Sequence, residues 1–279
     1  TCADLFYSNL LLNDVNKEIA RFLKENCYKG IVLIGAPLEI DGSLYNCAFV
    51  IKEHQILGIV PKRSLPNSKE FYEKRWFKSA LYNHMDSVYF NGEMVPFGNL
   101  IFDDFENNIH FGVEICEDMW APIAPSNMLS YHGANLIFNL SGSNETLGKS
   151  QIRRTTVLEN SRRNCGAYVY ASAGVNESTS ETVYSGHNII ASCGTLIKET
   201  ENFSEKSNKY ENKKQDAQNT EIQKPKHLVI DITNMEETEK AKLRGAIRFF
   251  NGEKNNIPVA VKTGDEIKPC GAIHLTEEI

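Results

Sequence analysis

The sequence predicts an α/β fold in which helices and strands are stacked in layers. Short apolar runs typical of buried strands alternate along the chain with stretches whose apolar residues recur every three or four positions, as in an amphipathic helix. Polar residues directly follow several of the apolar runs, as expected where an α/β sheet carries its site at the carboxyl ends of its strands. A chain of 279 residues with 41% hydrophobic residues can bury a sizeable core around such a sheet.

The first part of the chain predicts one helix and three strands. Apolar residues at helical spacing indicate the helix, and Gly30 is its expected stop. A short buried strand follows, and two β-rich runs separated by three residues predict a hairpin that delivers Lys62 at an edge of the sheet. The helix is expected at residues 11–23 and the strands at residues 31–37, 44–51 and 55–60.

Beyond residue 108, strands and helices alternate regularly. Ser126 is a candidate N-cap for the first of two helices, and a final hairpin is expected to turn at Cys193 and Gly194. The expected strands are residues 109–116, 135–141, 167–173, 187–192 and 194–199, and the helices are residues 126–134 and 149–166.

The chain divides into three parts by composition. Residues 1–200 carry the alternating pattern of one compact domain. Residues 201–226 are polar, charged and almost free of aliphatic side chains, so we expect a mobile insertion that cannot offset its ordering entropy by burial. Residues 227–279 predict a closing strand (227–232), a charged helix (235–245) and a weak strand (257–262).

The overall composition disfavours several classes of protein. A net charge of -6 argues against a nucleic-acid partner, which needs clustered Lys and Arg. Seven scattered cysteines with no CxxC pair predict neither a disulfide framework nor a metal site, and favour a reducing cytoplasm. No apolar stretch of about 18 residues occurs, so we expect no membrane partner.

Cys116 lies at the end of an apolar run, in FGVEICEDMW, and could be a buried core thiol, a metal ligand or a nucleophile. A lone cysteine at a strand end is more often a small buried hydrophobic residue. A thiol on a tight turn after a buried strand is, however, also well placed to attack a carbonyl, with the following backbone N–H stabilising the oxyanion. Lys62, if it lies nearby, would favour the thiolate.

Four stretches in order distinguish these alternatives. GIVPKRSLPNSKEFYEKRWF, FGVEICEDMW, ANLIFNLSGSNETLGK and YSGHNIIASCGTLI resemble the glutamine-hydrolysing domain of glutamine-dependent NAD synthetases, a branch of the nitrilase (carbon-nitrogen hydrolase) superfamily. The resemblance covers roughly residues 1–200. It implies a four-layer α-β-β-α sandwich and a Glu-Lys-Cys triad that hydrolyses glutamine to glutamate and ammonia.

The resemblance also implies roles for individual residues. Cys116 would attack the glutamine amide and form a thioester, while Lys62 and the backbone N–H of Glu117 would hold the oxyanion. The remaining candidates for substrate binding are Ser143 and Lys149 at the amino acid end of glutamine, Glu117 and Trp120 as pocket residues, and Glu70 as a support near the lysine.

The chain departs from the pattern of these relatives in two respects. The triad Glu lies just upstream of the residues that resemble TCADLF, so we expect the general base, and with it the first strand, to be missing here. No SGGxDS pyrophosphate loop occurs, so ATP, Mg and the amidation of deamido-NAD would belong to a separate synthetase domain, with no cofactor in this one. The resemblance further suggests a homo-oligomer.

Two alternatives remain open. The chain could be a catalytically silent scaffold or regulatory module of the same fold. It could also be a nitrilase or amidase acting on another amide, which would not need Ser143 and Lys149 for a charged substrate end.

Overall fold

The structure is a computed structural model that describes residues 2–105, 107–177 and 182–204, and the backbone of three further strands near the carboxyl terminus. The chain separates into two compact units, Thr1–Ser207 and Asn208–Ile279. Each unit is described by itself.

The first unit begins with a helix packed on a three-stranded antiparallel sheet. The order of this sheet is β1-β2-β3, and the helix α1 places Ile19 and Leu23 against it. A small β4-β5 hairpin contributes to the same core. The elements are η1 (Ala3–Tyr7), α1 (Asn9–Glu25), β1 (Ile31–Ile40), β2 (Ser43–Lys52), β3 (Gln55–Pro61), η2 (Glu73–Arg75), β4 (Ser87–Phe90) and β5 (Glu93–Pro96).

The second sheet has six strands in the order β11-β10-β9-β8-β7-β6. Its centre, β7-β8-β9, is parallel, and the outer strands are antiparallel. Parallel neighbours place the carboxyl ends of β7 and β8 at the same edge. The elements are β6 (Ile101–Asp104), β7 (Ile109–Ile115), η3 (Cys116–Trp120), α2 (Pro125–Tyr131), β8 (Leu136–Ser141), α3 (Lys149–Arg163), β9 (Ala167–Ser172), β10 (Ile189–Ser192) and β11 (Thr195–Glu199).

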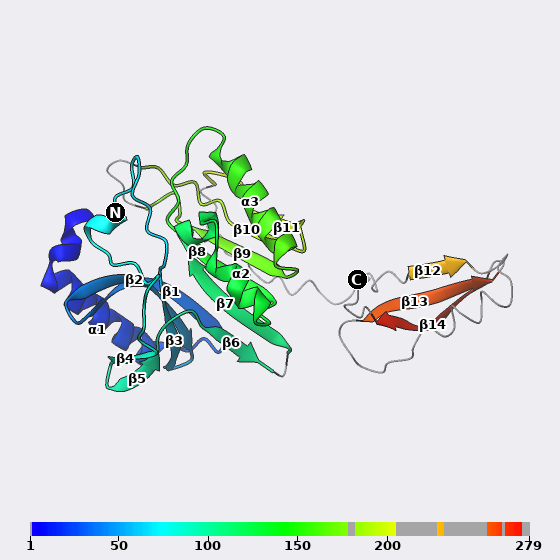
Figure 1. Cartoon of the computed structure of the whole chain (residues 1–279), viewed down its shortest axis with the longest axis horizontal. Helices are drawn as coiled ribbons and strands as arrows, with labels where there is room; N and C mark the ends of the chain where they lie inside the picture. Colours follow the sequence, from blue (N-terminus) through cyan, green and yellow to red (C-terminus); the bar gives the residue numbers. More distant parts are fainter. Residues whose placement is uncertain are drawn as a thin grey trace. The chain divides into compact units, whose positions relative to one another are not determined.

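Three apolar clusters hold four layers together (Figure 1). On β2, Phe49 faces the cluster under α1, whereas the neighbouring Val50 faces the cluster between the two sheets, because successive side chains of a strand point to opposite faces. The third cluster lies between the six-stranded sheet and the helices, where Val157 of α3 is fully buried. The predicted α-β-β-α sandwich is confirmed.

Most elements of the first unit were predicted at the right place, with three differences in detail. The helix α1 ends at Glu25 rather than at Gly30, because the side chain of Asn26 accepts the N–H of Tyr28 at 3.0 Å and takes the chain out of the helix. The strand β1 is mostly half-exposed rather than buried, because it lies at the end of its sheet and pairs with β2.

The third difference concerns the start of α2. Ser126 is not its N-cap; Ala124 is, and Pro125 occupies the first helical position that its fixed φ suits. The backbone N–H of Ser126 instead donates to the buried carboxyl of Glu114 at 2.9 Å. A side chain from β7 therefore replaces the local cap.

The second unit contains a three-stranded sheet in the order β12-β13-β14, formed by β12 (Leu228–Asp231), β13 (Asn256–Thr263) and β14 (Glu266–His274). The strands predicted at 227–232 and 257–262 correspond to β12 and β13. Most of the proposed insertion at 201–226 and the proposed helix at 235–245 lie outside the described residues.

A close contact at Gly166 makes this position sensitive to substitution. A Cβ atom there would lie 2.6 Å from the backbone oxygen of Asn135, which also accepts the N–H of Ala167 and so cannot move freely. We expect Gly166→Ala to lower the free energy of unfolding by about 1–3 kcal/mol, the usual range for overpacking. The midpoint of urea-induced unfolding measures it.

The matched control is Gly35→Ala in β1, where an added Cβ meets no atom within 4 Å. We expect the unfolding midpoint of this variant to stay at or slightly above that of the parent chain. An unchanged midpoint in Gly166→Ala would contradict the proposed contact.

Candidate active site

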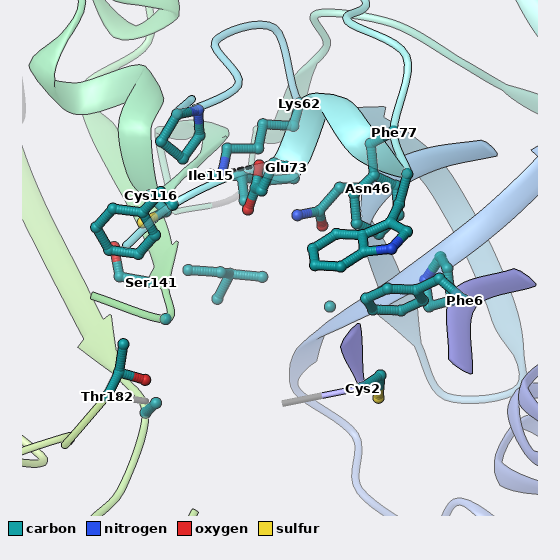
Figure 2. A pocket seen from close by; sticks show the side chains of 18 of the residues that line it. Cys2, Phe6, Asn46, Lys62, Glu73, Phe77, Ile115, Cys116, Ser141 and Thr182 are labelled. Carbon is teal, nitrogen blue, oxygen red and sulfur yellow. Dashed lines mark hydrogen bonds and ion pairs between the residues drawn. The ribbon is translucent and has the colours of Figure 1, made fainter. Parts of the chain in front are cut away.

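Three strand ends meet around one pocket of the first unit. Lys62 follows β3, Cys116 follows β7, and Ser141 ends β8. All three line a cavity of about 690 Å³, to which the loop after Lys62 contributes aromatic side chains such as Phe71. Figure 2 shows Cys116 and Ser141 on one wall, with Lys62 above them. Lys62 and Cys116, whose proximity the sequence left open, thus line the same cavity.

The backbone at Cys116 makes a sharp turn between β7 and the short helix η3. Its φ of 48° lies in the left-handed region, which is strained for a residue with a side chain. The amide of Asn139 donates to the carbonyl oxygen of Cys116 at 3.4 Å, and the hydroxyl of Ser141 donates to Asn139 at 2.6 Å. The adjacent strand β8 therefore supports the turn that carries the thiol.

Lys62 is a buried cation held by a carboxylate. Its side chain is 1% exposed, and its Nζ lies 2.7 Å from Oε2 of Glu73 (Figure 2). Burial by itself lowers the pKa of Lys62, but the interactions with Cys116 and Glu73 outweigh it, and the pKa lies above its usual value. Lys62 therefore remains an ammonium ion beside the thiol.

Asp118 joins the two strand ends that carry the lysine and the cysteine. Its Oδ1 accepts the backbone N–H groups of Ser64 at 2.7 Å and Arg63 at 3.2 Å, and its Oδ2 accepts that of Ile115 at 3.1 Å. Burial raises the pKa of Asp118, while these N–H donors and Lys62 oppose the rise. This carboxyl group fixes the distance between the loop after β3 and the turn after β7.

The surroundings of Cys116 act on its pKa in opposite directions. Burial raises its pKa, and although Lys62 lowers it, the charge of Glu73 adds to the rise. Lys62 thus acts in the expected direction but does not by itself produce a thiolate. A base must take the proton before or during any attack by the sulfur.

The loop after β8 carries charged and polar groups toward Glu70. Lys149, the first residue of α3, donates to the side-chain oxygen of Asn144, and the amide nitrogen of Asn144 donates to Glu70 at 2.5 Å. Ser143 is buried beside them. Glu70 lines the cavity but is held by Asn144, whereas Glu73, and not Glu70 as predicted, supports Lys62.

Two predicted pocket residues lie elsewhere. Trp120 packs on the cluster between the six-stranded sheet and the helices, because η3 turns its last residue toward α2 and α3, and it does not line the cavity. Glu117 is half-buried at the start of η3, and burial raises its pKa although Lys62 lowers it. Its side chain lies outside the cavity lining.

Five residues of this region were not singled out from the sequence as site residues. Glu73 stands three residues after the glutamate that we expected to act, and nothing local distinguishes the two. Asp118 in CEDMW and Arg153 are charged residues that the sequence does not mark as buried. A buried carboxylate or guanidinium group needs partners, so their structural importance could be recognised only once their burial was known. The others are Asn144 and Ser141.

The described residues contain no cluster of His, Cys, Asp and Glu that could hold a metal ion. In the same part of the chain, no helix is long and apolar enough to cross a membrane.

Comparison with known proteins identifies relatives. The profile of the Carbon-nitrogen hydrolase family matches residues 14–210. A protein of Mycobacterium tuberculosis named glutamine-dependent NAD(+) synthetase is 36% identical over 204 residues, which are 72% of this chain and 30% of that protein. The human protein of the same name is 28% identical over 213 residues. The chain thus spans about 30% of the length of these relatives.

Solved structures agree with the sequence matches. The crystal structure of a glutamine-dependent NAD(+) synthetase from Cytophaga hutchinsonii superposes with a TM-score of 0.64 at 30% identity, covering 73% of this chain and 33% of that one. An amidase of the nitrilase superfamily from Nesterenkonia AN1 superposes with a TM-score of 0.55 at 12% identity, covering 72% of this chain and 68% of that one, and this likeness shows the fold alone.

The role of Asp118 can be tested by Asp118→Asn. The amide has the same shape but turns an NH₂ group toward one of the three backbone N–H donors. We expect the free energy of unfolding to fall by about 1–3 kcal/mol, measured by urea denaturation, and Cys116 to be alkylated more slowly. Asp14→Asn, which removes an exposed carboxylate paired with Lys17, should change neither quantity. If Asp118→Asn were as stable as the parent chain, the proposed role of Asp118 in joining the two strand ends would be wrong.

The electrostatics of Cys116 predict the pH dependence of its alkylation by iodoacetamide. Because burial raises the pKa of the thiol, we expect the rate to keep rising beyond the pH at which an ordinary cysteine is half ionised, about 8.5. Lys62→Met removes the cation that lowers this pKa, so the profile should move to still higher pH. Peptide mapping at each pH gives the rate for Cys116 alone.

The control for this profile is Lys52→Met, which removes an exposed lysine at the end of β2 and should leave the alkylation of Cys116 unchanged. A shift to lower pH in Lys62→Met would show that the cation does not act on the thiol as described.

Proposed function

Since the chain belongs to the carbon-nitrogen hydrolase family, we propose that it hydrolyses the side-chain amide of glutamine to glutamate and ammonia through a thioester on Cys116. The observation that carries this proposal is the arrangement of a strained, buried thiol and the Lys62–Glu73 ion pair on the walls of one cavity. The names of the relatives support glutamine as the substrate.

The first half of the reaction forms the thioester. The sulfur of Cys116 attacks the amide carbon, its proton passes to a base, and the carbonyl oxygen becomes an oxyanion. The ammonium group of Lys62 and the backbone N–H of Glu117 stabilise this charge, in a buried setting where such interactions are strong. The carbon–nitrogen bond then breaks as the nitrogen receives the proton and leaves as ammonia.

The second half releases glutamate. A water molecule attacks the thioester carbon, its proton goes to the base, and the carbon–sulfur bond breaks to restore the thiol. The resemblance to the glutaminase domain implies that the glutamate of a Glu-Lys-Cys triad is this base. Glu73 is less suited to the task because its Oε2 is engaged by Lys62.

The ammonia needs an acceptor. By analogy with relatives named glutamine-dependent NAD(+) synthetases, it would pass to a synthetase domain that uses ATP to amidate deamido-NAD. ATP and Mg would bind to that domain, and no cofactor takes part in the steps assigned to Cys116. Assembly into a homo-oligomer and a cytoplasmic location remain part of the same proposal.

A covalent probe tests the site without requiring turnover. We expect an electrophilic analogue of glutamine, such as a chloroketone, to add to Cys116, and excess glutamine to slow the addition. Intact mass and peptide mapping of the purified chain measure this. Cys116→Ala should lose the label, and Cys165→Ala, which removes an exposed cysteine at the end of α3, should retain it.

The alternatives give different results. A folded chain with no label on Cys116 would favour a catalytically silent module. Labelling protected equally by glutamine and by a simple aliphatic amide would favour an amidase of another specificity. Loss of the label in both cysteine variants would point to misfolding.

A further inference from the structure

One neutral side chain at the edge of the pocket lies between two opposite charges. The oxygen of the Asn144 amide accepts a hydrogen bond from the ammonium group of Lys149, and its nitrogen donates to Oε1 of Glu70 at 2.5 Å. An asparagine can do both at once because its two ends differ in polarity. The cation and the anion are therefore linked through an amide.

Asn144 is held firmly in this position. Its side chain is buried, with 4% exposed. The guanidinium group of the fully buried Arg153 donates to the backbone oxygen of Asn144 at 3.1 Å and to Glu145 at 2.8 Å. Glu145 also accepts the hydroxyl of Ser185 at 2.7 Å, which ties the loop to a second segment.

One of the two charges lies at the wall of the cavity that contains Cys116, and the other lies next to that wall. Glu70 and Phe71 line the cavity, and Nζ of Lys149, which is not among the lining residues, lies 5.5 Å from the centre of the Phe71 ring. Burial lowers the pKa of Lys149, and the negative charges of Cys116 and Glu70 oppose this. The hydrogen bond from its own backbone N–H, that from Asn144 and the charge of Lys149 lower the pKa of Glu70, so it is a carboxylate at neutral pH.

The amide of Asn144 leaves hydrogen-bonding positions free on both Lys149 and Glu70. Lys149 has three N–H donors, of which Asn144 takes one. The Glu70 carboxylate has about four acceptor positions, of which Asn144 and the backbone N–H of Glu70 each use one. A direct ion pair between Lys149 and Glu70 would partly neutralise both groups. The separation therefore suits a ligand that carries one charge of each sign on neighbouring atoms.

We propose that Asn144 is a positioning residue that determines specificity, because it holds Lys149 and Glu70 apart as a receptor for a zwitterionic α-amino acid. The carboxylate of the substrate binds to Lys149 and its α-ammonium group binds to Glu70, while the side-chain amide extends toward Cys116. The inference rests on the proposed hydrolysis of glutamine and adds the residue that makes the site require both charges.

The experiment compares three ligands as protectors of Cys116 in the full chain. They are L-glutamine, glutaramate, which lacks the ammonium group, and γ-aminobutyramide, which lacks the carboxylate. Each is titrated against alkylation by iodoacetamide, and peptide mapping gives the concentration that halves the rate at Cys116. The readout is the advantage of L-glutamine, defined as the ratio of the protecting concentration of each analogue to that of L-glutamine. Partial unfolding would weaken protection by all three ligands alike and would leave this ratio unchanged.

We expect L-glutamine to protect the parent chain at a concentration roughly tenfold or more below that of either analogue, as for one charged hydrogen bond. In Asn144→Ala, Lys149 and Glu70 can pair directly, and this advantage should shrink about tenfold. Asn144→Gln, which keeps an amide with both functions, should restore part of it.

Asn26→Ala is the matched control, because it removes a buried asparagine with two or more hydrogen bonds near α1, outside the cavity lining. It should leave the advantage of L-glutamine unchanged. An unchanged advantage in Asn144→Ala would overturn this inference and leave the proposed function intact. Failure of L-glutamine to protect the parent chain would overturn both.

Discussion

The site depends on the carboxyl group of Asp118, which binds backbone N–H groups from both the loop after β3 and the end of β7. These two strands belong to different sheets, which pack together through an apolar cluster. The carboxyl group of Asp118 adds a polar link between them, which sets the position of Lys62 relative to Cys116. Reacting groups must be held within a fraction of an ångström, and apolar packing alone is less directional than hydrogen bonds. The packing of the two sheets brings Lys62 close to Cys116, and the hydrogen bonds of Asp118 align the two residues.

The buried cations Lys62 and Arg153 are each paired with a carboxylate, and the two pairs have different consequences. The ion pair with Glu73 keeps Lys62 charged beside the buried thiol of Cys116, whose surroundings would otherwise lack a positive charge. Arg153 with Glu145 has no contact with the cavity and instead fixes the loop after β8. Removing one partner of such a pair leaves an uncompensated charge, which is strongly destabilising. The same interactions therefore stabilise the fold and define the site.

The order of the elements could be predicted from the sequence because it is encoded by local periodicity and turn residues, as in α3 and the β10-β11 hairpin. Predictions failed where a distant residue replaced a local signal. Ser126 is not a cap because Glu114, twelve positions away, receives its N–H. Glu73 rather than Glu70 pairs with Lys62, and Trp120 packs beneath the sheet, because the path of a loop or a short helix depends on what it packs against.

The sequence by itself determined the α/β class, because strand and helix periods depend on neighbouring residues along the chain. Its ordered motifs, through their resemblance to glutaminase domains, implied the layered sandwich and made Cys116 the candidate nucleophile. The tertiary structure alone decided which carboxylate meets Lys62, that burial raises the pKa of the Cys116 thiol, and that Asn144 lies between Lys149 and Glu70. Burial and the approach of residues distant in sequence control these properties, and neither is encoded in a local pattern.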